Sequence, residues 1–155
     1  MNDNNIRLNA IGDLSRLPKY NYEALTKAIE DTKDNDRMTL TLCLSYSGRW
    51  EITQAAKKIA EKVKNGELDI EQINENSFSN FLNTSGMPDP ELLIRTSGEE
   101  RISNFLLWQL AYSEFYFTDK FWPDFSKEDL YQSIVDYQNR ERRFGKTSEQ
   151  LTEKK

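Results

Sequence analysis

The sequence predicts an α/β fold, a sandwich in which helices flank a parallel sheet. The order of the segments predicts the class, and the length and the aromatic content indicate one folded domain. Short apolar runs with strand character alternate along the chain with amphipathic stretches of helical spacing, and this order is typical of parallel sheets joined by right-handed crossovers. The 155 residues are enough for one domain, and the aromatic content of 12% argues against disorder.

Four segments have the character of strands. Residues 6–11 (IRLNAI) form the first apolar run, and residues 38–46 (MTLTLCLSY) form the clearest one. In the second run Met and Leu alternate with Thr, Cys and Ser, so both faces of the strand lack charge and can be covered by helices. The later runs at 92–94 and 115–117 are short and apolar, as is typical of buried strands.

The helices are predicted from apolar residues that recur every three or four positions. One of them begins after a capping residue, either Ser103 or Asn104. The last one begins at a capping box, in which Asp129 takes the place of glutamate three residues after Ser126. The predicted helices lie around residues 22–29, 52–63, 70–82 and 105–109, and from 127 toward 144.

The composition excludes several classes of chemistry. The chain has no histidine, which removes Ser-His-Asp and Cys-His nucleophile systems, histidine-ligated zinc and the usual general base at neutral pH. The net charge is −5, and neither half has the basic excess of a nucleic-acid-binding protein. The single cysteine, Cys43, cannot form an internal disulfide, which indicates a reducing compartment such as the cytoplasm. No run approaches the ~20 apolar residues of a membrane span.

The strongest candidate for a binding site is the loop that runs from Arg95 to Ser103, between a predicted strand and a predicted helix. The planar guanidinium groups of Arg95 and Arg101 match phosphate oxygens bidentately, and Gly98 lets backbone N–H groups approach an anion. Phosphate or diphosphate binding is therefore one interpretation. The alternative is a solvated loop whose arginines pair with the two glutamates that precede Arg101.

A second loop (SYSGRWE) follows the strand that is predicted at 38–46. Gly48 and the hydroxyl groups permit a tight turn, and Arg49 either faces a site or is braced by Glu51. The alternative is a helix-capping turn in which Trp50 fills the core. In a parallel sheet both loops, together with the turn that ends the first strand, lie at one edge, where such sheets bind ligands.

Glu114 is the lone acid within the aromatic stretch 108–117 (WQLAYSEFYF). Burying a carboxylate among aromatic side chains is costly unless it is paired or bound to a metal. Glu114 therefore either coordinates Mg²⁺ through its oxygens or pairs with an arginine. The third interpretation is an outward-facing position at the end of a helix.

The carboxyl-terminal half contains three long motifs, at residues 94–109 (IRTSGEERISNFLLWQ), 111–117 (AYSEFYF) and 122–125 (WPDF). On these motifs the chain closely resembles the cis-prenyltransferase family, which includes the undecaprenyl diphosphate synthases, also called isoprenyl transferases. The resemblance covers nearly the whole chain, from about residue 6 to residue 145. Further matches in the family order lie at residues 11–13, 46–50 and 140–145.

The resemblance implies an activity and its partners. Family members condense isopentenyl diphosphate with an allylic diphosphate, usually farnesyl diphosphate, and form new double bonds in cis. Mg²⁺ assists the departure of the allylic diphosphate. The resemblance also implies a cytoplasmic homodimer that makes a lipid carrier for the cell wall, with no nucleic acid among its partners and with peripheral membrane contact through the lipid product.

The resemblance assigns roles to individual residues. Those that match the family's ligands for the diphosphate of isopentenyl diphosphate are Arg95, Arg101 and Ser103. Glu114 matches a residue of the metal-binding and subunit-contact region. Arg143 and Gly145 match an Arg-x-Gly element that reaches toward a diphosphate, in some members across the dimer. One departure is Glu100, which stands where many relatives carry a histidine linked to metal binding.

One family segment has no match in this sequence. Relatives begin with a segment of the type Asp-Gly-Asn-Gly-Arg-Trp, whose aspartate is the principal metal-binding and catalytic carboxylate. We therefore expect residues 1–146 to form the carboxyl-terminal part of the family's α/β domain, incomplete at its amino-terminal side, and residues 147–155 to form a disordered tail. The expected origins are a fragment, a truncated gene model or a naturally shortened subunit.

The missing segment leads to two functional hypotheses. The first is that the chain belongs to a prenyltransferase, holds no catalytic residue of its own and has little or no activity alone. The alternative is a non-catalytic, diphosphate-binding or scaffold subunit of a prenyltransferase complex.

Overall fold

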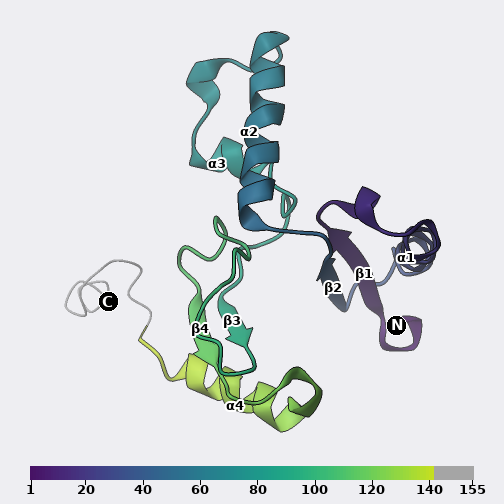
Figure 1. Cartoon of the computed structure of the whole chain (residues 1–155), viewed down its shortest axis with the longest axis vertical. Helices are drawn as coiled ribbons and strands as arrows, with labels where there is room; N and C mark the ends of the chain where they lie inside the picture. Colours follow the sequence, from purple (N-terminus) through teal and green to yellow (C-terminus); the bar gives the residue numbers. More distant parts are fainter. Residues whose placement is uncertain (142–155) are drawn as a thin grey trace. The chain divides into compact units, whose positions relative to one another are not determined.

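The structure is a computed structural model that describes residues 1–141. These residues divide into two compact units (Figure 1). The first unit consists of Met1–Pro88 together with Asn104–Leu106, and the second consists of Asp89–Ser103 and the residues from Leu107 onward. Within this part of the chain, every helix is too short or too polar to cross a bilayer. The predicted tail at 147–155 lies outside the described residues.

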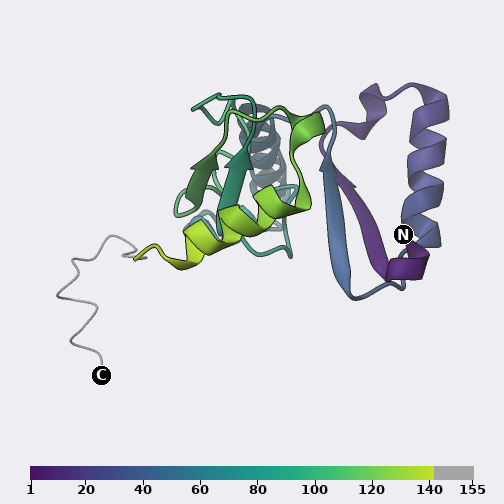
Figure 2. The same ribbon diagram turned by 90° about the horizontal axis from the view of Figure 1, so that it is seen from below.

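The first unit is built on a parallel pair of strands, β1 (Ile6–Ile11) and β2 (Met38–Cys43), as the sequence predicts. Their register pairs the first residue of each strand with the first of the other, and the last with the last. Helix α1 (Lys19–Asp31) connects the strands and lies alongside them (Figure 2). The strand predicted at 38–46 ends three residues early, because the chain turns at Ser45, whose φ is 48°.

Side chains that follow α1 close the outer edge of β1. The Leu8 N–H donates to Thr32 Oγ1 over 3.0 Å, and the Asn35 amide donates to the Ile6 carbonyl over 2.8 Å. Both groups point away from β2, so without these bonds they would form an open strand edge. Leu8 is buried here, whereas Leu40 of β2 is 43% exposed.

Helix α2 (Gly48–Lys64) follows β2 and packs through a buried stripe that includes Ala55 and Ile59. The helix predicted at 70–82 is wrong as a single element. It is divided into a 3₁₀ turn, η3 (Ile70–Gln72), and a short helix, α3 (Glu75–Ser79), beside α2 (Figure 1). The break occurs at Asn74, which has extended backbone and accepts the N–H groups of Asn76 and Ser77. A residue that caps a new helix in this way cannot continue the previous one.

The second unit contains another parallel pair, β3 (Leu92–Arg95) and β4 (Glu114–Phe117), in which Leu92 pairs with Glu114. Each strand is one residue longer than predicted. A 3₁₀ turn, η4 (Trp122–Asp124), leads to helix α4 (Lys127–Gln138). The predicted α/β class with parallel strands is thus confirmed. The prediction of one sheet is not, because the strands of the described residues form two separate pairs.

The helix predicted at 105–109 is wrong, because the chain forms a series of turns there. The backbone is left-handed at Ser103, Asn104 and Leu106, with φ values of 45°, 62° and 43°. A right-handed helix requires negative φ at consecutive residues, so it cannot form across these positions.

The amino-terminal end of α4 confirms the predicted capping box. Ser126 Oγ accepts the Asp129 N–H, and the Asp129 carboxylate accepts the Ser126 N–H over 2.8 Å. The same carboxylate forms an ion pair with Lys120 over 2.6 Å. The hydrogen bond from Lys120, followed by those from Ser126, lowers the pKa of Asp129 to about 2.

This lowered pKa predicts a pH-dependent contribution to stability. Because the folded pKa of about 2 lies below the ordinary 3.8, the contribution is present above about pH 4 and is lost as pH falls through the folded value. We expect Asp129→Asn to lower the melting temperature at pH 7 and the difference from wild type to shrink between about pH 4 and pH 2. Thermal unfolding followed by circular dichroism measures this. Glu128→Gln, in the same helical turn, is the control, and a pH-independent difference for Asp129→Asn would contradict the prediction.

Candidate functional site

The loop predicted to bind an anion leaves the carboxyl end of β3, in the second unit. Arg95 is the last residue of β3 and is half-buried, and its carbonyl accepts the Thr118 N–H over 3.0 Å. The loop therefore begins at the edge of a parallel strand pair where α/β proteins place their ligands.

The start of this loop is fixed by backbone bonds to the segment that follows β4. The Ser97 N–H donates to the Lys120 carbonyl over 2.8 Å, and the Gly98 N–H donates to the Thr118 carbonyl over 2.9 Å. The N–H of Gly98 itself is thus already bonded, and an approach of other backbone N–H groups of the loop to an anion stays a prediction. Glycine suits this position because its φ is 65° and a Cβ there would lie 3.0 Å from Asp119 Oδ1.

Arg101 and Ser103 lie on the far part of the same loop. The Arg101 side chain is 64% exposed and forms an ion pair with Glu99, the pairing that the alternative interpretation of the loop predicts. Exposed ion pairs contribute little to the free energy of folding, about 0–1 kcal/mol. A more highly charged anion can therefore displace Glu99 from Arg101. Ser103 is exposed, with left-handed backbone. The structure therefore places the two arginines and the serine on one short loop and leaves Arg101 accessible.

Glu114, the predicted metal ligand, is the first residue of β4 and is half-buried. Its Oε2 lies 3.0 Å from Nη1 of Arg140, which also donates to the Phe115 carbonyl over 2.8 Å. Asp136, one turn before Arg140, accepts from its Nε over 2.9 Å. These carboxylates raise the pKa of Arg140, with the hydrogen bond to Glu114 as the largest cause. The interpretation that Glu114 pairs with an arginine is thus confirmed.

The described residues do not form a complete Mg²⁺ centre by themselves. Across residues 1–141, no three or more Asp, Glu, Cys or His side chains gather in a way that could hold a metal ion. The carboxylate of Glu114 is also engaged by Arg140. Metal binding by Glu114 therefore stays a prediction, and we assign no chemical step to Mg²⁺. The two remaining predicted site residues, Arg143 and Gly145, lie outside the described part of the chain.

The second candidate loop leads into the amino-terminal end of α2, but the predicted cap is not seen, because the Ser47 side chain makes no capping hydrogen bond. Gly48 is the first helical residue, and Trp50 is half-buried. Glu51 is fully buried and accepts hydrogen bonds from the Tyr46 hydroxyl, over 2.5 Å, and from the Asn83 N–H, over 2.7 Å. Glu51 therefore connects the start of α2 to the segments that contain Tyr46 and Asn83. Arg49, the other charged residue of this loop, is exposed.

Two asparagines that the sequence did not single out as site residues complete this arrangement. Asn83 Oδ1 accepts the Gly12 N–H over 3.3 Å, which connects the end of β1 to the Glu51 cluster. Asn104 accepts two N–H groups of α2: Gly48 donates to its carbonyl over 2.7 Å, and Arg49 donates to its Oδ1 over 2.9 Å. The sequence predicted a capping role for Asn104 at a helix of its own, whereas the structure shows it capping α2. No local signal could have indicated this partner.

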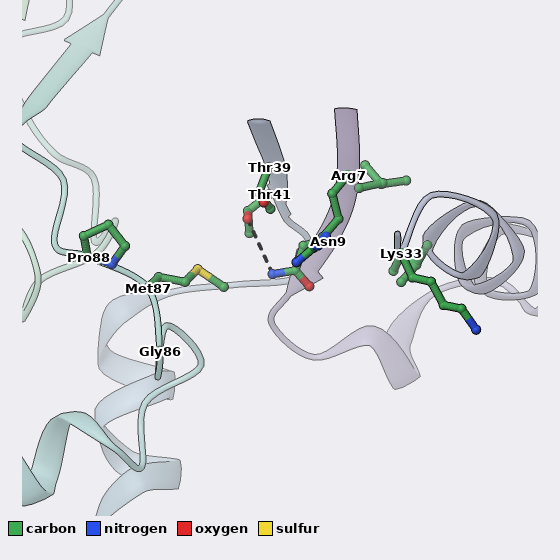
Figure 3. Close-up of a pocket in the computed structure, with 10 residues that line it drawn as sticks. Arg7, Asn9, Lys33, Thr39, Thr41, Gly86, Met87 and Pro88 are labelled. Atoms are coloured by element: carbon green, nitrogen blue, oxygen red, sulfur yellow. Dashed lines mark hydrogen bonds between the residues drawn. The ribbon is translucent and has the colours of Figure 1, made fainter. Parts of the chain in front are cut away.

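A hollow of about 660 Å³ lies over β1 and β2 in the first unit (Figure 3). Its strand wall combines the apolar Leu8 with polar side chains, among which the Asn9 amide donates to Thr41 Oγ1 over 3.5 Å. The amino group of Lys33 points away from the strands (Figure 3) and pairs with Glu30. The hollow was not predicted from the sequence. Its labelled lining residues are Arg7, Asn9, Lys33, Thr39, Thr41, Gly86, Met87 and Pro88.

The family of the chain follows from comparison with known proteins. A family model for undecaprenyl diphosphate synthases, of the prenyltransferase type, matches residues 1–145. The chain belongs to the cis-prenyltransferase family. The match covers the strands, the loop from Arg95 and the start of α2, and it confirms the resemblance carried by the sequence motifs.

Individual cis-prenyltransferases show how close the likeness is. The isoprenyl transferase of Chlorobaculum tepidum is 56% identical over 149 residues, which are 96% of this chain and 56% of that protein. The Micrococcus luteus ditrans,polycis-undecaprenyl-diphosphate synthase, described as specific for (2E,6E)-farnesyl diphosphate, is 52% identical over 92% of this chain and 57% of that protein. The chain thus spans little more than half the length of the curated relatives it matches.

A solved structure extends the comparison to the fold. The crystal structure of lavandulyl diphosphate synthase from Lavandula x intermedia, in complex with dimethylallyl diphosphate, matches with a TM-score of 0.88 and 45% identity. The match covers 91% of this chain and 61% of that one. The α/β fold with parallel strands is therefore that of the cis-prenyltransferases.

The Arg140 cluster predicts a large effect of one substitution on the stability of the second unit. We expect Arg140→Met to lower the free energy of unfolding by on the order of 2 kcal/mol, because it removes hydrogen bonds to two carboxylates and a carbonyl. Urea unfolding followed by tryptophan fluorescence measures this. Arg16→Met, at an exposed arginine of the first unit, is the control and should change stability by less than about 0.5 kcal/mol. Equal effects of the two substitutions would show that the cluster does not stabilise the fold.

Proposed function

We propose that this chain binds the diphosphate of isopentenyl diphosphate through the loop from Arg95 to Ser103 and takes part in cis-prenyl transfer. The observation that carries the proposal is the position of this loop at the carboxyl end of β3, with Arg101 accessible on it, in a chain of the cis-prenyltransferase family. Parallel sheets bind ligands at that edge.

The chemistry of the loop suits a diphosphate. The guanidinium groups of Arg95 and Arg101 are permanently charged and can each bind two phosphate oxygens, and the Ser103 hydroxyl can donate a further hydrogen bond. Glu99, the present partner of Arg101, carries a single negative charge. A diphosphate carries more charge and more acceptor oxygens, so it competes well for the same guanidinium. The role of these groups is to hold and orient the substrate.

The second substrate in this proposal is an allylic diphosphate of the farnesyl type. Two relatives support it: the Micrococcus luteus synthase is described as specific for (2E,6E)-farnesyl diphosphate, and the lavandulyl diphosphate synthase structure contains dimethylallyl diphosphate. The product is then a cis-polyprenyl diphosphate such as undecaprenyl diphosphate. Mg²⁺, a diphosphate contact by Arg143 and Gly145, homodimer formation, a cytoplasmic location and membrane contact through the lipid product belong to the same proposal.

The proposed diphosphate contact predicts the effect of removing one guanidinium. We expect Arg101→Ala to weaken the binding of isopentenyl diphosphate by roughly tenfold or more, because charge-assisted hydrogen bonds are worth ~1.5–3 kcal/mol each. Isothermal titration calorimetry with the 155-residue chain measures the dissociation constant. Arg16→Ala, at an exposed arginine of the first unit, should leave it unchanged. An unchanged affinity in Arg101→Ala, or a preference of the wild type for nucleotides, would refute the proposed site.

The catalytic competence of the chain is a separate prediction. The sequence contains no match to the family's Asp-Gly-Asn-Gly-Arg-Trp segment, so we expect the purified chain to elongate farnesyl diphosphate no faster than a protein-free control. Incorporation of labelled isopentenyl diphosphate in the presence of Mg²⁺ measures this. The Chlorobaculum tepidum isoprenyl transferase serves as the active control. Metal-dependent elongation by the chain alone would contradict the expectation, while stable co-purification with a full-length prenyltransferase would favour the scaffold role.

A further inference from the structure

The loop that leaves Arg95 begins with two neighbouring residues in left-handed backbone. The φ values are 73° at Ser97 and 65° at Gly98. Glycine adopts this conformation readily, but residues with a Cβ populate it sparsely, so contacts elsewhere have to hold Ser97 there. The conformation of the loop start is therefore imposed by the groups to which it is bonded.

These groups lie in one short segment, residues 118–120, which directly follows β4. The backbone of Thr118 bonds the loop twice: its N–H donates to the Arg95 carbonyl over 3.0 Å, and its carbonyl accepts the Gly98 N–H over 2.9 Å. The Lys120 carbonyl accepts the Ser97 N–H over 2.8 Å. The loop start and the segment 118–120 belong to the same compact unit. The conformation of this segment therefore determines where the left-handed residues of the loop lie.

The hydroxyl group of Thr118 holds the segment in its turn. Its Oγ1 accepts the Lys120 N–H over 3.3 Å, a local bond that threonine can form with the backbone two residues later. The bond joins the two residues whose carbonyls accept from the loop, so it fixes one acceptor relative to the other. The ion pair of Lys120 with Asp129, over 2.6 Å, ties the same segment to the start of α4.

We propose that Thr118 is a positioning residue for the diphosphate loop. Its hydroxyl group fixes the turn after β4, and the turn fixes the left-handed backbone through which the loop leaves Arg95. This inference rests on the proposed function of the loop. Thr118 acts through its neighbours and does not itself contact the ligand. A loop whose start is held before binding loses less conformational entropy when it closes on a diphosphate.

The variant that tests the proposal is Thr118→Val. Valine is also β-branched and keeps both backbone bonds of residue 118, but it cannot accept the Lys120 N–H. We expect the dissociation constant of the 155-residue chain for isopentenyl diphosphate, measured by calorimetry, to rise roughly fivefold, the change that corresponds to one net hydrogen bond. Thr118→Ser keeps the hydroxyl group and should bind within about twofold of wild type.

A matched control lies in the same unit. Ser113 directly precedes β4, at the opposite end of the strand from Thr118, and its hydroxyl donates to the Pro90 carbonyl over 2.5 Å. Ser113→Ala therefore also removes one side-chain hydrogen bond from the second unit, but it removes none that involves residues 95–98 or 118–120. It should leave the dissociation constant within about twofold of wild type.

Amide hydrogen exchange of the chain without ligand gives an independent readout. In Thr118→Val we expect faster exchange at the N–H groups of Ser97 and Gly98, because their acceptors lie in the segment 118–120. Thr118→Ser and Ser113→Ala should leave these N–H groups as protected as in wild type.

The outcomes separate this inference from the proposed function. If wild type binds isopentenyl diphosphate and Thr118→Val binds equally well, the positioning role is overturned and the function stands. Equal weakening in Thr118→Ser or Ser113→Ala would also overturn it, as would weaker binding of Thr118→Val with unchanged exchange at the loop start. If wild type does not bind isopentenyl diphosphate, the proposed function is overturned and this inference with it. Weaker binding and faster exchange confined to Thr118→Val would support the proposal.

Discussion

The need to satisfy the first turn of α2 determines much of the first unit. Helical N–H groups at an amino terminus have no partner within the helix, and here the cap comes from Asn104, far away in the sequence. The same turn contains Glu51, a fully buried carboxylate that accepts bonds from the Tyr46 hydroxyl and the Asn83 N–H. A buried carboxylate is stable only with such donors, so two segments that are distant in the sequence, at Asn83 and Asn104, bond to one helix end.

The features that could be predicted from the sequence are those set by nearby residues. The strand character of β2 and the capping box at Asp129 involve residues within a few positions of one another, and both were predicted correctly. The expectation that helices cover both faces of β2 is wrong for its first half, because Met38, Thr39 and Leu40 are exposed within the described residues. The helix at 105–109 was predicted wrongly because a cap was assigned to the adjacent segment. The side chain of Asn104 instead bonds a helix 55 positions away, and its left-handed backbone prevents a helix from starting. The break at Asn74 had a local signal, an asparagine before an acidic turn, but the apolar spacing obscured it.

The candidate site was predictable in its residue types and less so in its contacts. The arginines and the serine of the loop from Arg95 could be identified because their chemistry suits a diphosphate. The hydrogen bond from the Gly98 N–H to the Thr118 carbonyl could not be predicted, since only the pairing of β3 with β4 brings that carbonyl near. Similarly, the sequence left three interpretations of Glu114 open: a metal ligand, the partner of an arginine and an outward-facing position. The arginine proved to be Arg140, one residue beyond the cap of α4.

The outer edge of β1 is occupied by side-chain hydrogen bonds, which disfavours the pairing of a further strand on that side of the first sheet. Thr32 and Asn35 occupy the outward backbone groups of Leu8 and Ile6, so a new strand could pair there only by displacing both side chains. The far edge of β2 has no strand neighbour within residues 1–141. Pairing of a further strand is therefore favoured beside β2 and disfavoured beside β1, where it would cost both side-chain hydrogen bonds.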